Sequence, residues 1–195
     1  MNIYMYRNVL YMEVSDIRKF LTDFYNKDFP REFVIINNGI LFYRKLINTF
    51  DEAYDKYWNL NGMSNIYMSV NSVREITNQE FSRIYMDFDD EIEPQNANKE
   101  ALMVRNYVKN KYGGDPLLLY SGNKGSNIYI FMKPMNLQSY KETMRYFFDS
   151  LRNELDLKYL DYSSCGDYMR VSRIPYSINV NGGNLCSYIE EINMI

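Results

Sequence analysis

Tyr85-Met86-Asp87-Phe88-Asp89-Asp90-Glu91 is the most informative segment of this 195-residue chain. An apolar run ends here in a cluster of acids, and alternation along a strand turns Asp87 and Asp89 to one face while Phe88 points into the core. Two carboxylates this close raise each other's proton affinity unless a divalent cation lies between them, and Mg²⁺ or Mn²⁺ with nucleotide phosphates fits that geometry. A solvated acidic loop after a strand gives the same pattern, so the pair alone is a weak indication.

Ser121-Gly122-Asn123-Lys124-Gly125-Ser126-Asn127 places two glycines and a lysine between apolar strands expected at 117–120 and 128–132. The glycines can take positive φ and let backbone N–H groups approach an anion, while Lys124 supplies a positive charge. The segment therefore predicts a phosphate-binding loop, although an ordinary hairpin loop has a similar composition. Its spacing excludes a Walker loop.

Arg170-Val171-Ser172-Arg173-Ile174-Pro175-Tyr176-Ser177-Ile178-Asn179 carries two arginines on a short strand whose exit Pro175 fixes. Asp161 lies fourteen residues before Pro175. A lone aspartate in a loop is usually a turn or cap residue, so Asp161 gains functional weight only from the other two segments. The arginines could equally form structural ion pairs with nearby acids.

Composition narrows the chemistry. The chain has two cysteines, Cys165 and Cys186, and no histidine, so a four-ligand Cys/His zinc site and histidine-based nucleophilic catalysis are excluded within one chain. Carboxylates that hold a hard cation are the remaining option. The formal net charge of −3 argues against binding duplex DNA through bulk electrostatics. Neither a signal peptide nor a membrane span is expected, and the default compartment is the cytoplasm.

Periodicity predicts helices and strands that alternate irregularly within a single domain over 1–195. Helical stripes favour helices near 15–26, 50–57, 96–112 and 137–155, and β-rich runs favour strands at 32–36, 40–46, 65–70, 83–88, 117–120 and 128–132, with a final hairpin-like pair around Asn181-Gly182-Gly183. Hairpins mixed with helices favour an α+β fold with a mixed, partly antiparallel sheet over a doubly wound parallel one. The acids and the glycine loop are expected to meet at one end of that sheet.

In kind, order and spacing, the three segments resemble the active-site motifs of the archaeo-eukaryotic primase superfamily, which includes small catalytic primase subunits and viral and plasmid primase-polymerases. The family carries a paired acidic motif on a strand, a Ser-Gly-basic-basic-Gly-x-His loop, and an Asp before a basic strand and a Pro-x-Ser-apolar-His/Asn turn. Upstream, Arg31-Glu32-Phe33 resembles an Arg-Glu-Phe segment of the small subunit. The resemblance spans nearly the whole chain and implies a primase catalytic core, with an RRM-like half, flanked by helices.

The resemblance also implies roles for individual residues. Asp87, Asp89 and Asp161 are expected to be catalytic and to hold two Mg²⁺ or Mn²⁺ ions, without zinc. Nucleotide binding is expected from a larger set of residues: Ser121, Gly122, Asn123, Lys124, Gly125, Asn127, Arg170, Arg173, Ser177 and Asn179. The implied activity is synthesis of short RNA or DNA primers for DNA replication, from nucleoside triphosphates on a single-stranded DNA template. A large primase subunit and a replicative helicase are the candidate protein partners.

Two departures from the family pattern keep other functions open. Asn127 stands where the family has His, and Asn181 stands where many members have Lys, and both replaced side chains contact phosphate in the family. Asparagine carries no charge, and charge-assisted hydrogen bonds are about twice as strong as neutral ones. A catalytically impaired, primase-like nucleic-acid-binding or accessory subunit is therefore the alternative hypothesis. A metal-dependent nuclease or a nucleotide cyclase that uses the same carboxylates is a third.

Overall fold

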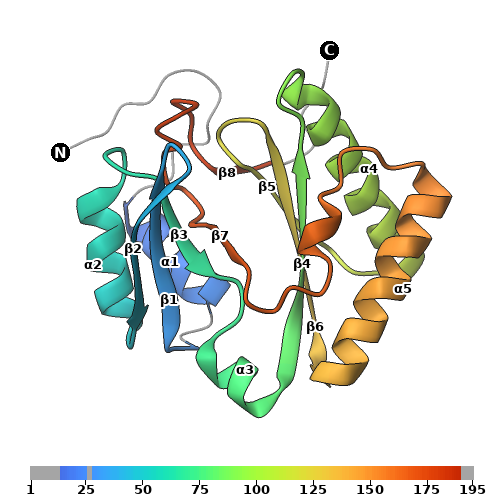
Figure 1. Cartoon of the computed structure of the whole chain (residues 1–195), viewed down its shortest axis with the longest axis horizontal. Coiled ribbons are helices and arrows are strands. Elements are labelled where there is room, and N and C mark those ends of the chain that lie inside the picture. The colour runs from blue at the N-terminus through green and yellow to red at the C-terminus, as the bar shows by residue number, and fades with distance from the viewer. Residues whose placement is uncertain (1–13, 26–27, 190–195) are drawn as a thin grey trace.

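The computed structural model describes residues 14–25 and 28–189, which form two sheets lying side by side with helices packed against them (Figure 1). The first sheet has the strand order β2-β1-β3-β7 and the second β4-β6-β5-β8. The elements are α1 (Val14–Tyr25), β1 (Arg31–Asn37), β2 (Ile40–Ile47), α2 (Phe50–Leu60), β3 (Ile66–Ser69), α3 (Val73–Asn78), β4 (Glu80–Asp89), α4 (Pro94–Tyr112), β5 (Leu117–Tyr120), β6 (Gly125–Asn136), α5 (Leu137–Leu155), the 3₁₀ turn η1 (Tyr162–Ser164), β7 (Val171–Arg173) and β8 (Ser187–Tyr188).

All pairs between these strands are antiparallel. The predicted α+β fold is confirmed, and the strands divide between two sheets rather than forming a single one. No helix within residues 14–25 and 28–189 has both the length and the apolar character that a membrane span requires.

The first sheet begins with the predicted hairpin. Asn38 and Gly39 have φ angles of 50° and 77°, and positive φ at both central residues is the geometry that joins two twisted antiparallel strands in a tight turn. Arg31, at the start of β1, is fully buried, and its Nη1 donates to the carbonyl oxygens of Ser69 and Val70 at 2.9 and 2.8 Å. This side chain ties the start of β1 to the end of β3.

The second sheet follows a β-α-β-β-α-β order in which the last strand is reduced to a few residues. After α5, the chain returns along the free side of β4, where Leu160 forms an antiparallel bridge with Phe88. Asp89 N donates to Tyr159 O at 3.1 Å, and Asp161 N donates to Asp87 O at 2.8 Å. This is the order of a ferredoxin-like unit, which agrees with the RRM-like half that the resemblance implies.

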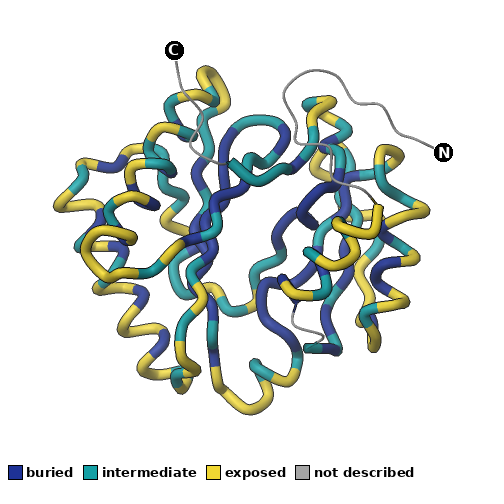
Figure 2. The backbone as a smooth tube through the Cα atoms, turned by 180° about the vertical axis from the view of Figure 1, so that it is seen from behind, coloured by how far each residue is buried: buried dark blue, intermediate teal, exposed yellow. Residues whose placement is uncertain are grey.

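Two apolar cores flank β4, and their separation fixes which way its side chains point. Met86 and Phe88 pack against α4 and α5, whereas Tyr85 packs with Tyr129 in the core that α1, α2 and the first sheet share. The buried segments run through the middle of the molecule in Figure 2. Because side chains alternate along a strand, the face of Tyr85 continues outward through Asp87 and Asp89.

Three features differ from the sequence-based expectation. The short helix α3 was not predicted; Ser72 caps it through a reciprocal pair of hydrogen bonds with Glu75. Strands β4 and β6 are longer than predicted because they pair with each other along most of their length. The expected final hairpin is only partly formed. Ile178 and Leu185 form a bridge, but β7 pairs with β3 and β8 pairs with β5, so the segment 171–188 links the two sheets.

Gly125 is the position where the fold leaves no room for a side chain. It pairs with Asp89 at the end of β4, and a Cβ atom there would lie 1.7 Å from the carbonyl oxygen of Phe88. We expect Gly125→Ala to lower the free energy of unfolding by at least about 2 kcal/mol, because the two strands must separate to accommodate the methyl group. Urea unfolding followed by circular dichroism measures this loss.

Gly114→Ala is the matched control. A Cβ atom at Gly114 meets nothing within 4 Å, so the substitution should change stability by less than about 0.5 kcal/mol. Equal stability of the two variants would contradict the close approach of β4 and β6.

Candidate active site

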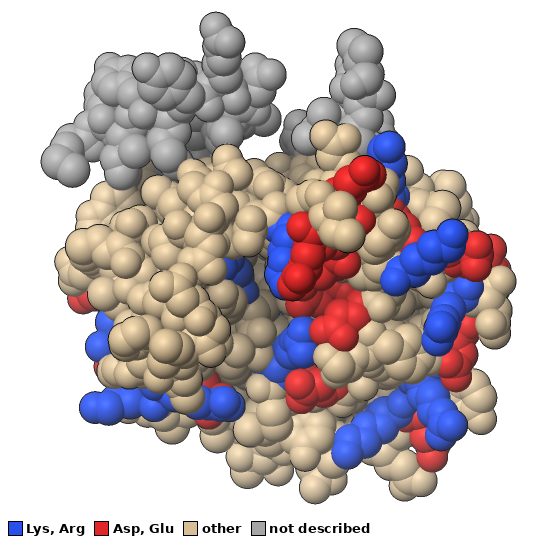
Figure 3. Space-filling model, turned by 45° about the horizontal axis from the view of Figure 1, so that its top comes forward, with Lys and Arg blue, Asp and Glu red and all other residues tan. Residues whose placement is uncertain are grey.

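A cleft of about 370 Å³ lies between the two sheets, and both sheets contribute to its walls. Acidic and basic side chains meet along the hollow between the two halves of the molecule in Figure 3. Most of the residues predicted to form the site line this cleft: Asp87, Asp89, Ser121, Asn123, Lys124, Asn127, Arg170, Arg173 and Asn179. The segments quoted from the sequence therefore meet in space.

Asp87 and Asp89 lie on the cleft side of β4, as alternation along the strand predicts. Burial, reinforced by the neighbouring charge of Asp89, raises the pKa of Asp87 to about 6. Burial also raises the pKa of Asp89 above its ordinary value. Both shifts mean that the folded protein disfavours negative charge at this position, so that a cation bound here would be stabilised.

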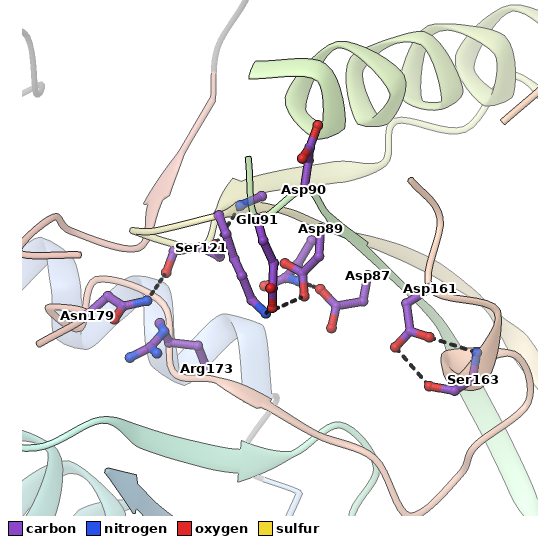
Figure 4. Close-up of polar contacts among 12 residues, drawn as sticks. Asp87, Asp89, Asp90, Glu91, Ser121, Asp161, Ser163, Arg173 and Asn179 are labelled. Atoms are coloured by element: carbon purple, nitrogen blue, oxygen red, sulfur yellow. Dashed lines mark hydrogen bonds and ion pairs between the residues drawn. The ribbon is translucent and has the colours of Figure 1, made fainter. Parts of the chain in front are cut away.

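Asp161 reaches the same site through the backbone of residues 159–161, which pairs with β4. Figure 4 shows Asp89, Asp87 and Asp161 arranged in a row. Asp161 also caps the turn η1, where its carboxylate accepts hydrogen bonds from Ser163 N and Ser163 Oγ, both at 2.8 Å. Burial acts to raise the pKa of Asp161, but the hydrogen bonds from Ser163 and Arg170 outweigh it and the pKa is lowered. Asp161 therefore caps η1 and also lies beside Asp87.

Arg170 joins two of the three acids. Its Nη2 atom lies 3.0 Å from Asp87 Oδ2 and 2.8 Å from Asp161 Oδ2. Although burial acts to lower the pKa of Arg170, Tyr85 and the two carboxylates raise it above its ordinary value. Within the described residues, no three Cys, His, Asp or Glu side chains converge as the ligands of one metal ion. The guanidinium is the cation that the structure places between Asp87 and Asp161.

Lys124 lies over the outer acids of the cluster. Its Nζ atom is 3.1 Å from Glu91 Oε1 and 3.7 Å from Asp89 Oδ2, and the contact with Glu91 raises its pKa. Both Glu91 and Lys124 are substantially exposed, so these contacts are weak and solvent-screened. Lys124 can therefore exchange its partners for an anion that enters the cleft.

Different structural constraints exclude a side chain at Gly122 and at Gly125. Gly122 has a φ of +82°, and a Cβ atom there would lie 2.6 Å from Asn184 O. The φ of Gly125 lies outside the left-handed region, so of the two glycines only Gly122 uses the positive φ that both can adopt. Close approach to β4 explains Gly125, and close approach to the turn after β7 explains Gly122. Ser121 closes the loop by accepting a hydrogen bond from Gly125 N at 3.2 Å.

Asn127 contacts Asp87 directly, which its sequence position did not indicate. Its Nδ2 atom donates to Asp87 Oδ1 at 2.6 Å and to Tyr85 Oη at 3.0 Å, and the residue is 4% exposed. This side chain holds one oxygen of Asp87 in place. Asn181 accepts a hydrogen bond from Asn65 Nδ2 at 3.1 Å, at the far side of the cleft.

The remaining predicted residues organise the chain around the cleft. Arg173 donates to Asn65 Oδ1 and to Tyr67 Oη, both at 2.9 Å. Asn179 donates to Ser121 O at 3.3 Å and so joins the glycine loop to the last turn. Ser177 is fully buried, and its hydroxyl donates to Ile174 O, so its place is within the turn and outside the cleft wall.

Two aromatic residues of the cleft were not singled out from the sequence, namely Tyr67 and Tyr85. Tyr85 lies two residues before Asp87 on the same face of β4, so the alternation that placed the acids could also have identified it. Tyr67 belongs to the other sheet, and no pattern in the sequence links it to the acids.

Solved structures with the same architecture include two domains of nucleic-acid-synthesising enzymes. The polymerase domain of ligase D from Mycobacterium tuberculosis, in complex with DNA, superposes with a TM-score of 0.58 at 12% identity, over 90% of this chain and 80% of that domain. The AEP domain of the cyanophage S-2L primase-polymerase superposes with a TM-score of 0.58 at 13% identity, over 93% of this chain and 92% of that domain.

No protein-family model matches the sequence, and no curated protein matches it significantly. At such low identity the structural likeness is evidence about architecture only. The chain has the fold of these polymerase and primase-polymerase domains.

Proposed function

We propose that this chain is a template-dependent nucleotidyltransferase that synthesises short RNA or DNA primers by a two-metal mechanism. The observation that carries the proposal is the meeting of Asp87 and Asp89 in one cleft with Lys124, Arg170 and Arg173. Arg170 also contacts Asp161, which lies next to Asp87. The fold shared with polymerase and primase-polymerase domains adds support. A nucleotide-transfer site requires carboxylates and cations close together, because metal ions and a polyphosphate must be held side by side.

The donor set fits Mg²⁺ or Mn²⁺. Carboxylate oxygens are the ligands that hard divalent cations prefer, and the raised pKa values of Asp87 and Asp89 reflect negative charge that the protein alone does not fully stabilise. Asp87, Asp89 and Asp161 would hold the ions. When bound, the metal ions would acidify the primer 3′-hydroxyl and neutralise the leaving pyrophosphate.

The chain's own residues would bind and orient the nucleotide. Lys124 and Arg173 bring positive charge to the cleft, where a triphosphate would be neutralised, and Asn127 keeps the Asp87 carboxylate in one orientation. Ile36 and Tyr67, from the first sheet, give the cleft an apolar wall suited to a base or a sugar. Single-stranded DNA is the proposed template.

A primase-like binding or accessory subunit is the second candidate. One observation in its favour is that the side chains of Asn127 and Asn181 are neutral. A second is that Arg170 already forms ion pairs with the carboxylates of Asp87 and Asp161. Incubation with labelled nucleoside triphosphates, single-stranded DNA and Mn²⁺ separates the two functions. Labelled primers support the polymerase, whereas DNA binding without any synthesis supports the accessory subunit.

Asp87→Asn tests the metal-binding acids. We expect primer synthesis to fall by at least about 100-fold, because the amide removes a charged ligand from the reacting centre. The variant should remain folded at pH 7. Because the pKa of Asp87 is raised to about 6 in the folded protein, ionisation of this carboxyl lowers the stability of the fold as the pH rises through that value. The amide of the variant does not ionise, so it does not lower the stability in this way.

Asp55→Asn is the control for this experiment, because Asp55 is an exposed residue on α2. Primer synthesis is measured by gel electrophoresis and folding by circular dichroism. Undiminished, metal-dependent synthesis by Asp87→Asn would remove Asp87 from the mechanism.

Lys124→Gln tests the nucleotide-binding loop. The substitution should raise the KM for the nucleoside triphosphate by about tenfold and affect kcat less, since it removes one charge-assisted contact with phosphate. Steady-state kinetics with varied nucleotide concentration measures both constants. Lys141→Gln, on the exposed face of α5, should leave them unchanged. A KM that stays at the wild-type value would show that Lys124 does not contact the nucleotide.

A further inference from the structure

One guanidinium nitrogen of Arg170 holds two of the proposed metal ligands at once. Its Nη2 atom contacts Oδ2 of Asp87 and Oδ2 of Asp161 at 3.0 and 2.8 Å. All three side chains are largely buried, with exposed fractions of 24% for Arg170, 16% for Asp87 and 31% for Asp161. These contacts are consequently less screened by solvent than the surface ion pair of Lys124.

The other oxygen of each acid also accepts a hydrogen bond, and Asp161 Oδ2 accepts a second one from Ser163 Oγ at 2.8 Å. Asp87 Oδ1 accepts a hydrogen bond from Asn127 at 2.6 Å, and Asp161 Oδ1 accepts one from Ser163 N at 2.8 Å. Arg170 Nη2 lies between the two Oδ2 atoms, where a divalent ion that binds both of these oxygens would also have to lie. Mg²⁺ requires oxygen ligands at about 2.0–2.1 Å, and a second positive charge so close to the guanidinium would be repelled.

We propose that Arg170 is a latch on the metal site: in the metal-free protein it neutralises Asp87 and Asp161, and a divalent ion binds between them only by displacing it. The proposal rests on the proposed function, because it takes these acids to be the metal ligands. Whenever the site holds no metal, the guanidinium of Arg170 balances the negative charge of these two buried carboxylates.

Displacement would also make the guanidinium available to the substrate. Arg170 lies immediately before β7, lines the same cleft as Lys124 and Arg173, and would be released beside the position of an incoming polyphosphate. A nucleotide that binds the released guanidinium would favour the open latch and so tighten metal binding, and linkage requires the metal to tighten nucleotide binding by the same factor. The two ligands would then bind cooperatively.

The expected size of the effect follows from the population of the closed latch. If the latch is closed in about 90–99% of metal-free molecules, the apparent dissociation constant is about 10–100 times the value for an open site. Arg170→Gln removes the competing cation and should tighten Mn²⁺ binding by that factor. The dissociation constant is measured on the full chain, without nucleotide, from the electron paramagnetic resonance signal of free Mn²⁺.

Arg173→Gln is the matched control. It removes the same charge from the same cleft, but Arg173 donates to Asn65 and Tyr67 and not to the acids. General electrostatic attraction alone predicts equal tightening in both variants, whereas the latch predicts tightening in Arg170→Gln that exceeds the control by at least about tenfold.

Thermal unfolding gives a second readout that does not depend on catalysis. In EDTA, Arg170→Gln should melt below the wild type, because Asp87 and Asp161 are left without their shared cation. Saturating Mn²⁺ should then raise the Tm of Arg170→Gln by more than it raises the Tm of the wild type. A variant that fails to fold in EDTA but folds in Mn²⁺ meets this expectation in its strongest form.

The outcomes separate this inference from the proposed function. Mn²⁺ binding by the wild type and Arg170→Gln with equal affinity, or weaker binding by the variant, overturns the latch and leaves the metal site standing. Absence of Mn²⁺ binding in both proteins overturns the latch together with the proposed metal site. Tightening confined to Arg170→Gln supports it.

Discussion

Strand β4 is paired on both edges at its acidic end, and the positions of Asp87, Asp89 and Asp161 depend on that pairing. On one side Asp89 pairs with Gly125, which brings the glycine loop against the acids. On the other side Asp87 O accepts a hydrogen bond from Asp161 N, which brings in an acid from more than seventy residues away. Backbone hydrogen bonds thus assemble the site, and the side chains follow from alternation along the strands.

The site concentrates charge where burial disfavours it. The pKa values of Asp87 and Asp89 are raised because burial opposes ionisation, and the nearby cations only partly offset this. Carboxylates with raised pKa values in a cleft are typical of catalytic sites, although structural ion-pair networks also perturb pKa values. Here the same residues lie beside a hollow large enough for a ligand, which favours a functional interpretation over a purely structural one.

The sequence allowed the local parts of this arrangement to be predicted. Alternation placed Asp87 and Asp89 on one face, and Asn-Gly predicted the first hairpin. The position of Asp161 followed only from family resemblance, since the three residues that pair with β4 form no recognisable strand. The partners of Asn127 and the tight packing of Gly125 depend on contacts between strands, which periodicity does not encode. The short helix α3 was missed because six residues carry too little pattern.

The central claim of the proposed function is that Asp87, Asp89 and Asp161 together hold the divalent ions once Arg170 has moved away from Asp87 and Asp161. Anomalous diffraction from crystals of the protein grown with Mn²⁺ and a non-hydrolysable nucleoside triphosphate tests it most directly. The account predicts Mn²⁺ peaks within coordination distance of carboxylate oxygens from all three residues, with Arg170 turned away from Asp87 and Asp161. Peaks bound elsewhere, or Mn²⁺ held without any of these three carboxylates, would contradict it.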